Sequence, residues 1–283
     1  MDAVFLALTS AALFGGMTVA LRPALARGGA SAELGALWTV VPAFAVVVTA
    51  AVVRFDFDLA GLSPFVLAGL LGPGLSQTLF TLGVRDAGPA RASVTVGTAP
   101  LFSVAIALVF LGEPVVAGVL AGAILIVGGG LLLVRERDRP SHVRRIGLAF
   151  ALGSTVVFAT RDNLVRWLAV DSDVSPELAA AATVGAGILV ITVWVAIARR
   201  PFALAPLRFF APAGLLFGLS YVCLFEAFYR GRVTVVSPLV ATESLWGVGL
   251  SALFLRRLEV VGTRLVVGAA LIVLGGVLIG VFR

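Results

Sequence analysis

The sequence contains no lysine, one cysteine and one histidine, and each scarcity excludes a kind of function. Without lysine there is no G-x-x-x-x-G-K-[ST] loop to hold ATP phosphates, so energy must come from a gradient or from exchange. Cys223 on its own forms neither a disulfide framework nor a thiolate metal site. His142 with scattered carboxylates offers no cluster of catalytic side chains. We therefore expect no cofactor, no metal and no enzyme activity.

Charged residues are also scarce. They form 13% of the chain, whereas soluble proteins have roughly a quarter. Hydrophobic residues form 60%, and the mean hydropathy is +1.11. No water-soluble packing hides that much apolar surface, so we predict a multi-pass protein of the cell (inner or plasma) membrane. The N-terminal apolar run lacks the basic region and processing site of a signal peptide and is predicted to be a retained span.

All 21 basic residues are arginine, and the isoelectric point is near 11.1. In a soluble protein this charge would suggest nucleic acid as a partner. Here the arginines lie mostly between apolar runs, where they orient helices in a membrane, so no nucleic-acid partner is expected.

Ten apolar segments each have about the 20 residues that a helix needs to cross a hydrocarbon core. They are residues 3–21, 33–53, 63–84, 89–111, 115–134, 146–168, 177–198, 208–229, 233–255 and 262–282. The predicted fold class is an all-α polytopic membrane protein with ten transmembrane helices.

The sequence repeats itself at about half its length. A displacement of 144 residues places Ser93 on Ser237 and Phe110 on Phe254. We predict a first five-helix repeat over 1–134, a charged linker over 135–145 and a second repeat over 146–283. Because five is odd, the second copy is inverted relative to the first, an arrangement typical of secondary transporters.

The arginines are distributed unevenly between the two predicted membrane faces. Fifteen of them lie on the side of the linker 135–145, and the side with both termini has five. The positive-inside rule places the linker in the cytoplasm and both termini outside.

Several short motifs are similar to those of EamA-type transporters of the drug/metabolite transporter superfamily. They are Phe110-Leu111-Gly112-Glu113, Gly122 nine residues later, the Gly128–Gly130 cluster and the segment Val84–Ala90. The resemblance implies export or exchange of small metabolites, amino acids or amphipathic compounds, often coupled to protons. It also implies a cavity formed mainly by the third, fourth, eighth and ninth helices, and termini in the cytoplasm, opposite to the arginine count. The second copy departs from the pattern, with Arg256-Arg257 where the first has Gly112-Glu113.

A charged residue deep in a span costs roughly 2.5–3.5 kcal/mol, so it needs a partner or a function. Glu243 lies near the middle of the ninth segment, and its counterpart in the first copy is Ala99. Because burial favours the protonated acid, Glu243 is a candidate for proton exchange or for binding an amine, the alternative being a permanent pair with an arginine. Arg161 and Asp162 are neighbours in the sixth segment and need not pair with each other. Arg161 could pair with Glu243 or hold a substrate carboxylate, unless the helix ends early and both residues lie at the interface.

Other candidates have simpler structural explanations. Glu226 can form a helical ion pair with Arg230, and Glu113 before Pro114 is interpreted as a helix cap. Trp246 follows Glu243 by three residues and is predicted to lie on nearly the same face. The remaining candidates are cavity-lining Trp38 and Gln77, the possible kinks at Pro73, Pro100 and Pro238, and close-packing glycines at 122, 128–130, 268 and 275–276.

The sequence thus predicts a secondary active transporter that exports or exchanges a small organic metabolite with protons. Its substrate and proton pathway is predicted to include Glu243, Arg161, Asp162, Trp246, Glu226, Gln77 and Trp38. A passive channel or facilitator is the alternative, and a membrane-embedded enzyme is a more distant one. The expected partners are a small-molecule substrate, protons and the lipid bilayer, and a homodimer is compatible with the sequence.

Overall fold

The computed structural model describes residues 2–54, 61–110, 116–134, 144–170, 172–231, 233–255 and 262–282. Within these ranges every regular element is a helix. The helices of the first half are α1 (Ala3–Arg27), α2 (Ala32–Val53), α3 (Ser63–Gly69), the π-helical turn η1 (Leu70–Leu75), α4 (Ser76–Ala87), α5 (Pro89–Val96), α6 (Ala99–Phe110) and α7 (Ala117–Val134). Those of the second half are α8 (Arg145–Val170), α9 (Pro176–Ile197), α10 (Leu207–Arg230), α11 (Val233–Val240), α12 (Glu243–Phe254) and α13 (Thr263–Phe282). Helices occur in all ten predicted segments, although three of the segments are interrupted, and Glu113, His142 and most of the predicted linker lie outside the described residues.

The helix ends follow local sequence signals. Ser31 caps α2 by accepting a hydrogen bond from the Leu34 backbone N–H, and Ser175 caps α9 in the same way. Between α4 and α5 the chain turns at Gly88, whose φ of 85° suits glycine because it has no Cβ. Pro89 then occupies the first position of α5, where its missing N–H costs nothing.

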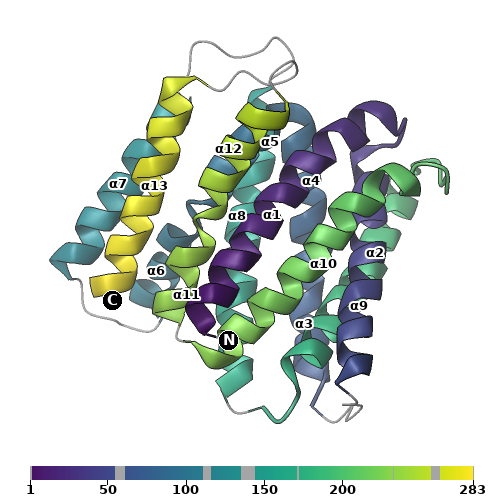
Figure 1. Ribbon diagram of the computed structural model, residues 1–283, viewed down its shortest axis with the longest axis horizontal. Helices are drawn as coiled ribbons and strands as arrows, with labels where there is room; N and C mark the ends of the chain where they lie inside the picture. The colour runs from purple at the N-terminus through teal and green to yellow at the C-terminus, as the bar shows by residue number, and fades with distance from the viewer. Residues whose placement is uncertain are drawn as a thin grey trace.

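The helices form one bundle in which both termini lie at the same end (Figure 1). Helix α1 packs against α10, α4 against α8, α2 against α9, and α7 against α13. The α7–α13 contact depends on glycine: a Cβ added at Gly122 would lie 2.6 Å from the Gly275 carbonyl oxygen. A Cβ at Gly129 would lie at the same distance from the Gly268 carbonyl oxygen. The predicted close packing is therefore confirmed at these four positions.

The same prediction is wrong for two neighbouring glycines. A Cβ added at Gly128 or Gly130 would meet nothing within 4 Å. On a helix these two positions flank Gly129 by about 100° on either side, so they turn away from α13.

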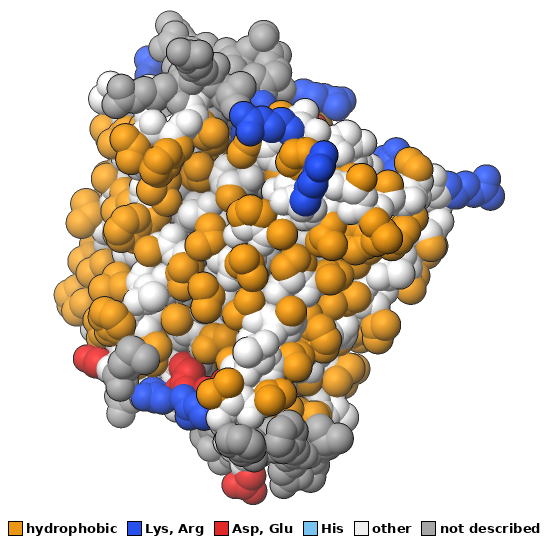
Figure 2. All heavy atoms as spheres, turned by 45° about the vertical axis from the view of Figure 1, so that its right-hand side comes forward, with side chains coloured by type: hydrophobic (Ala, Val, Ile, Leu, Met, Phe, Trp, Pro, Cys, Tyr) orange, Lys and Arg blue, Asp and Glu red, His pale blue; other side chains and the backbone are white. Residues whose placement is uncertain are grey.

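The outer surface is that of a membrane protein. Figure 2 shows a broad band of apolar side chains between arginines at one end and a smaller charged cluster at the other. Six helical segments are long and apolar enough to cross a bilayer: Ala3–Arg27, Ala32–Val53, Ser63–Ala87, Pro176–Ile197, Leu207–Arg230 and Thr263–Phe282. Helix α8 is long enough, but Arg161, Asp162 and Arg166 lower its hydropathy.

Three of the predicted segments are broken. The third bends through η1 at Gly72, where φ is −140° and ψ is 121°, just before Pro73. The fourth divides into α5 and α6 at Gly97-Thr98, and the ninth divides into α11 and α12 at Ala241-Thr242. These last two breaks are 144 residues apart, so they occupy the same place in the two copies.

Candidate functional site

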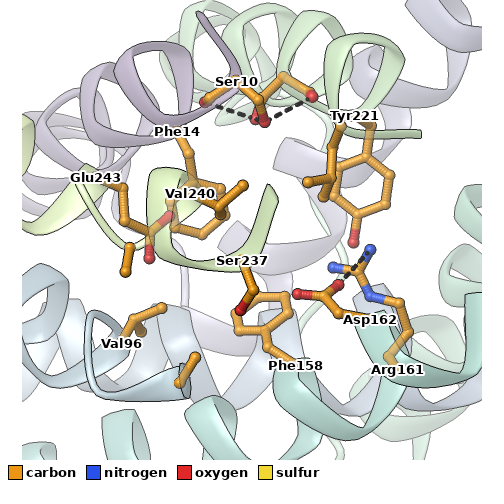
Figure 3. Close-up of a pocket in the computed structure, with 14 residues that line it drawn as sticks. Ser10, Phe14, Val96, Phe158, Arg161, Asp162, Tyr221, Ser237, Val240 and Glu243 are labelled. Atoms are coloured by element: carbon orange, nitrogen blue, oxygen red, sulfur yellow. Dashed lines mark hydrogen bonds and ion pairs between the residues drawn. The ribbon is translucent and has the colours of Figure 1, made fainter. Parts of the chain in front are cut away.

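A cavity lies in the middle of the bundle, between the α5–α6 break and the α11–α12 break (Figure 3). Its volume is about 40 Å³, room for only a few water molecules, so a small organic ligand enters only as the walls move apart. Its walls come from α1, the α5–α6 break, α8, α10 and the α11–α12 break. The lining residues are Ser10, Phe14, Val96, Ala99, Phe158, Arg161, Asp162, Ser220, Tyr221, Leu224, Ser237, Val240, Ala241 and Glu243.

The cavity uses some of the helices that the resemblance implied. The fourth, eighth and ninth predicted segments contribute lining residues, and so do the first and the sixth. The third contributes none, although its bend lies behind the wall: a Cβ on Gly72 would come within 3.1 Å of Arg161 Nε.

Glu243 is the first residue of α12 and lies on one wall of the cavity (Figure 3). Only 4% of its surface is exposed, and it makes no hydrogen bond or ion pair within the described part of the chain. At the break, the backbone N–H groups of Thr242, Ser244 and Leu245 donate to carbonyls three residues earlier. Glu243 therefore lies at the N-terminal end of α12, where the helix dipole is positive. A carboxyl group without a cationic partner in such a place can take up a proton or bind a cationic group.

Arg161 lies on the opposite wall and is 1% exposed. Its Cζ is 4.9 Å from the centre of the Tyr221 ring and 5.6 Å from that of Phe158, so the guanidinium is held by cation–π contacts. Its Nη1 lies 3.2 Å from Oδ1 of Asp162, so the two neighbours form the ion pair that adjacency alone did not require. Helix α8 continues to Val170, so the alternative that it ends at this pair is wrong.

The polar atoms of this wall are not saturated. Nε and Nη1 of Arg161, Oδ1 of Asp162 and the Tyr221 hydroxyl are buried and lack a hydrogen-bond partner in the described structure. Leaving a buried polar group unsatisfied costs about 1–3 kcal/mol, and more for a charged group. These donors and acceptors are therefore unused, and they lie just beneath the surface of the cavity.

Two serines connect the halves at the cavity edge. The Ser10 hydroxyl of α1 donates to the Ser220 carbonyl of α10 at 3.0 Å, and the Ser220 hydroxyl donates to the Ser10 carbonyl at 3.0 Å. Ser154 of α8 donates to the Ser76 carbonyl of α4 at 2.9 Å. Both pairs join the two halves. At the displacement of 144 residues Ser10 corresponds to Ser154 and Ser76 to Ser220, so the second pair repeats the first.

Glu226 does not line the cavity. Its two carboxylate oxygens each lie 2.6 Å from an arginine nitrogen, one on Arg54 and one on Arg230. Arg54 also lies 3.1 Å from Glu177, so the four residues form an ion-pair cluster at the end of the bundle that carries the termini. The predicted helical pair of Glu226 with Arg230 is present within it.

The three other predicted residues also lie outside the cavity lining. Trp246 is 46% exposed, and its Cβ packs against Gly15. The Trp38 indole N–H donates to the Ala203 carbonyl at 2.8 Å. Gln77 is fully buried, and its amide atoms have no hydrogen-bond partner among the described residues.

The prediction from sequence omitted Ser10, Phe14, Phe158 and Tyr221. A signal existed for two of them, because the displacement of 144 residues places Phe14 on Phe158. These two rings also meet in the structure, with centroids 5.9 Å apart.

The fold and the cavity define a class: a helical multi-pass membrane protein with a buried, partly charged site between its two halves. The comparisons with known proteins agree with this class. The sequence model of the EamA-like transporter family matches residues 1–135 and 145–281, and the chain belongs to this family. It is a family of membrane transporters, so the predicted membership is confirmed.

One solved crystal structure superposes with a TM-score of 0.70 over 98% of this chain and 95% of its own, at 20% sequence identity. At this identity the likeness shows the fold alone. No curated protein sequence gives a significant match.

Proposed function

We propose that this protein is a secondary active transporter of the cell membrane that exports or exchanges a small organic metabolite, an amino acid or an amphipathic compound, against protons. The observation that carries the proposal is the cavity between the halves, where Glu243 is buried opposite Arg161 and Asp162 with no hydrogen-bond or ion-pair partner among the described residues. A buried charge without a structural role is typical of substrate and proton pathways in membrane proteins.

The architecture would be ten membrane crossings in two inverted repeats, 1–134 and 146–283. Two ion pairs support it, whose glutamates are related by a displacement of 144 residues and whose arginines by one of 146. Glu33 at the start of α2 lies 3.0 Å from Arg200, just after the end of α9. Its counterpart Glu177 at the start of α9 lies 3.1 Å from Arg54, just after the end of α2. Helices α2 and α9 are thus joined by an ion pair at each end, as two copies in opposite orientation would be.

The broken helices support a site near the midplane. In transporters built from inverted repeats, discontinuous helices bring backbone groups and helix ends to a substrate cavity. Here the α5–α6 and α11–α12 breaks both border the cavity, through Ala99 and through Ala241 and Glu243. Rocking of one half against the other would open this site to each side in turn.

Glu243 is the proposed proton-exchanging group. Its carboxyl group faces apolar neighbours including Val96 and Val240 (Figure 3). Uptake of a proton removes the cost of a desolvated charge, and arrival of substrate returns the proton to solvent. The first copy has Ala99 at this position, so the fold itself does not require the carboxylate.

The test uses the full-length protein in proteoliposomes that contain a pH-sensitive dye. Solutes that raise the melting temperature of the purified protein are added outside, and proton movement is recorded. Proton flux that depends on solute supports the proposal. Solute entry with no proton movement and no trans-stimulation would instead identify a passive facilitator.

A further inference from the structure

The Arg161 wall indicates what chemical group the substrate carries. We propose that Arg161 and Tyr221 bind the carboxylate of an organic anion whose flat apolar body lies against the Phe158 and Tyr221 rings. The inference rests on the proposed function in that the cavity is taken as the transport site, but it concerns recognition and not coupling.

The first argument is that the donors on this wall are unused. Arg161 Nη1 and the Tyr221 hydroxyl are buried in the cavity wall and have no acceptor in the part of the chain that the structure describes, and the hydroxyl points toward the guanidinium group (Figure 3). Asp162 neutralises Arg161 at 3.2 Å, but the contact lacks hydrogen-bond geometry, so Oδ1 and Nη1 both remain unsatisfied. A carboxylate has two acceptor oxygens on one planar group and is the natural partner of a guanidinium fork.

The second argument is that the fold does not need an arginine here. At the equivalent position of the first copy, 144 residues earlier, the chain has Met17, which is also fully buried. The equivalent of Tyr221 is Gln77. One copy thus packs this position with an apolar side chain, and the charge in the other copy requires a separate reason.

The third argument is that space has been made for the arginine. Its side chain runs past Gly72, where a Cβ would lie 3.1 Å from Nε and 3.4 Å from Cγ. The equivalent of Gly72 in the second copy is Leu216, in the uninterrupted helix α10. The bend at Gly72 in the first half therefore accommodates the charged side chain of the second half.

The chemistry of the neighbouring groups defines the rest of the ligand. The rings of Phe14, Phe158 and Tyr221 give the cavity an apolar, aromatic wall next to the guanidinium. Aromatic rings favour a flat apolar group that stacks or meets them edge to face. The expected class is a small carboxylate on an aromatic or similarly flat body.

The experiment compares two probes of the same shape on detergent-purified, full-length protein. Phenylacetate carries the carboxylate, and phenylacetamide is its neutral isostere. By titration calorimetry we expect phenylacetate to bind about tenfold or more tightly than phenylacetamide, because a hydrogen bond to a charged group contributes at least that factor. Arg161→Met should remove this preference, and Tyr221→Phe should reduce it while keeping the ring. Arg208→Met, which changes an exposed arginine outside the cavity, should leave it unchanged.

The outcomes are distinguishable. Equal binding of the two probes, or a preference that persists in Arg161→Met, overturns the inference. If Arg161→Met does not fold, an unchanged preference in Tyr221→Phe overturns it instead. Phenylacetate that binds through Arg161 but never crosses a liposome membrane contradicts the transport proposal and leaves the recognition site standing. Proton-linked transport of another solute, with no binding of phenylacetate, contradicts the recognition site alone.

Discussion

The contact between α5 and α12 allows a sharp test of the packing beside the cavity. A Cβ added at Gly247 would overlap both Oγ and Cβ of Ser93, and backbone of Ser93 is the next atom in range at 3.9 Å. Gly247→Ala therefore forces two helices apart one turn beyond Glu243. Overpacking of this kind costs about 1–3 kcal/mol, so the variant should unfold at a temperature several degrees lower.

The matching substitution on the other helix should repair the damage. Ser93→Gly removes both atoms that the new methyl group meets, at a helix-propensity cost of about 0.5 kcal/mol or less. We expect the double variant to return to within about 1 kcal/mol of the original protein, an interaction energy of about 1–3 kcal/mol in a double-mutant cycle.

Gly249 supplies the control on the same helix. A Cβ at Gly249 meets nothing within 4 Å, so Gly249→Ala should be neutral or stabilise α12 by about 0.5–1 kcal/mol. The assay is thermal unfolding in detergent of the four proteins of the cycle and this control. Equal melting temperatures for Gly247→Ala and Gly249→Ala, or no rescue by Ser93→Gly, would refute the packing argument.

Three further predictions follow from other contacts. Gly129→Val should lower stability by about 1–3 kcal/mol, because its side chain would collide with the Gly268 carbonyl, while Gly128→Val should not. Equal melting temperatures for the two variants would contradict the packing of α7 on α13. Gly72→Ala should weaken phenylacetate binding several-fold without removing any charge, because the added methyl group displaces Arg161. An unchanged affinity by calorimetry would show that the bend at Gly72 does not position the guanidinium group. Glu226→Gln should lower the free energy of unfolding by about 1 kcal/mol, since the arginine partners of Glu226 are half-exposed. It should leave the pH dependence of transport in proteoliposomes unaltered, and an altered pH profile would place Glu226 in the proton pathway.

Hydropathy was enough to locate the helices because membrane-crossing segments have a characteristic length and composition. It did not reveal that the fourth and ninth segments are each two helices. Pro100 and Pro238, predicted as possible kinks, do lie beside the two breaks: Pro100 is the second residue of α6, and Pro238 lies in α11, four residues before Thr242. Neither proline marks the break itself, which falls at Gly97-Thr98 and at Ala241-Thr242. Glu243, predicted near the middle of a span, is therefore the first residue of a helix.

The candidate site was predicted through its charges and missed through its aromatic residues. A buried charge is costly enough to be conspicuous in an apolar run, as Glu243, Arg161 and Asp162 are. Phe158 and Tyr221 resemble ordinary core residues, and only the contact of their rings with Arg161 distinguishes them. Trp246 shows the opposite error, because three-residue spacing from Glu243 did not bring it into the cavity lining.

The central claim is that Glu243 couples substrate movement to protons, and the most direct measurement is the pH dependence of transport in Glu243→Gln. Proteoliposomes with the original protein should transport substrate at a rate that changes with pH and should move protons. Those with Glu243→Gln should still bind substrate but show a flat pH profile and no substrate-dependent proton flux. Transport by Glu243→Gln with the original pH dependence and proton flux would contradict the claim.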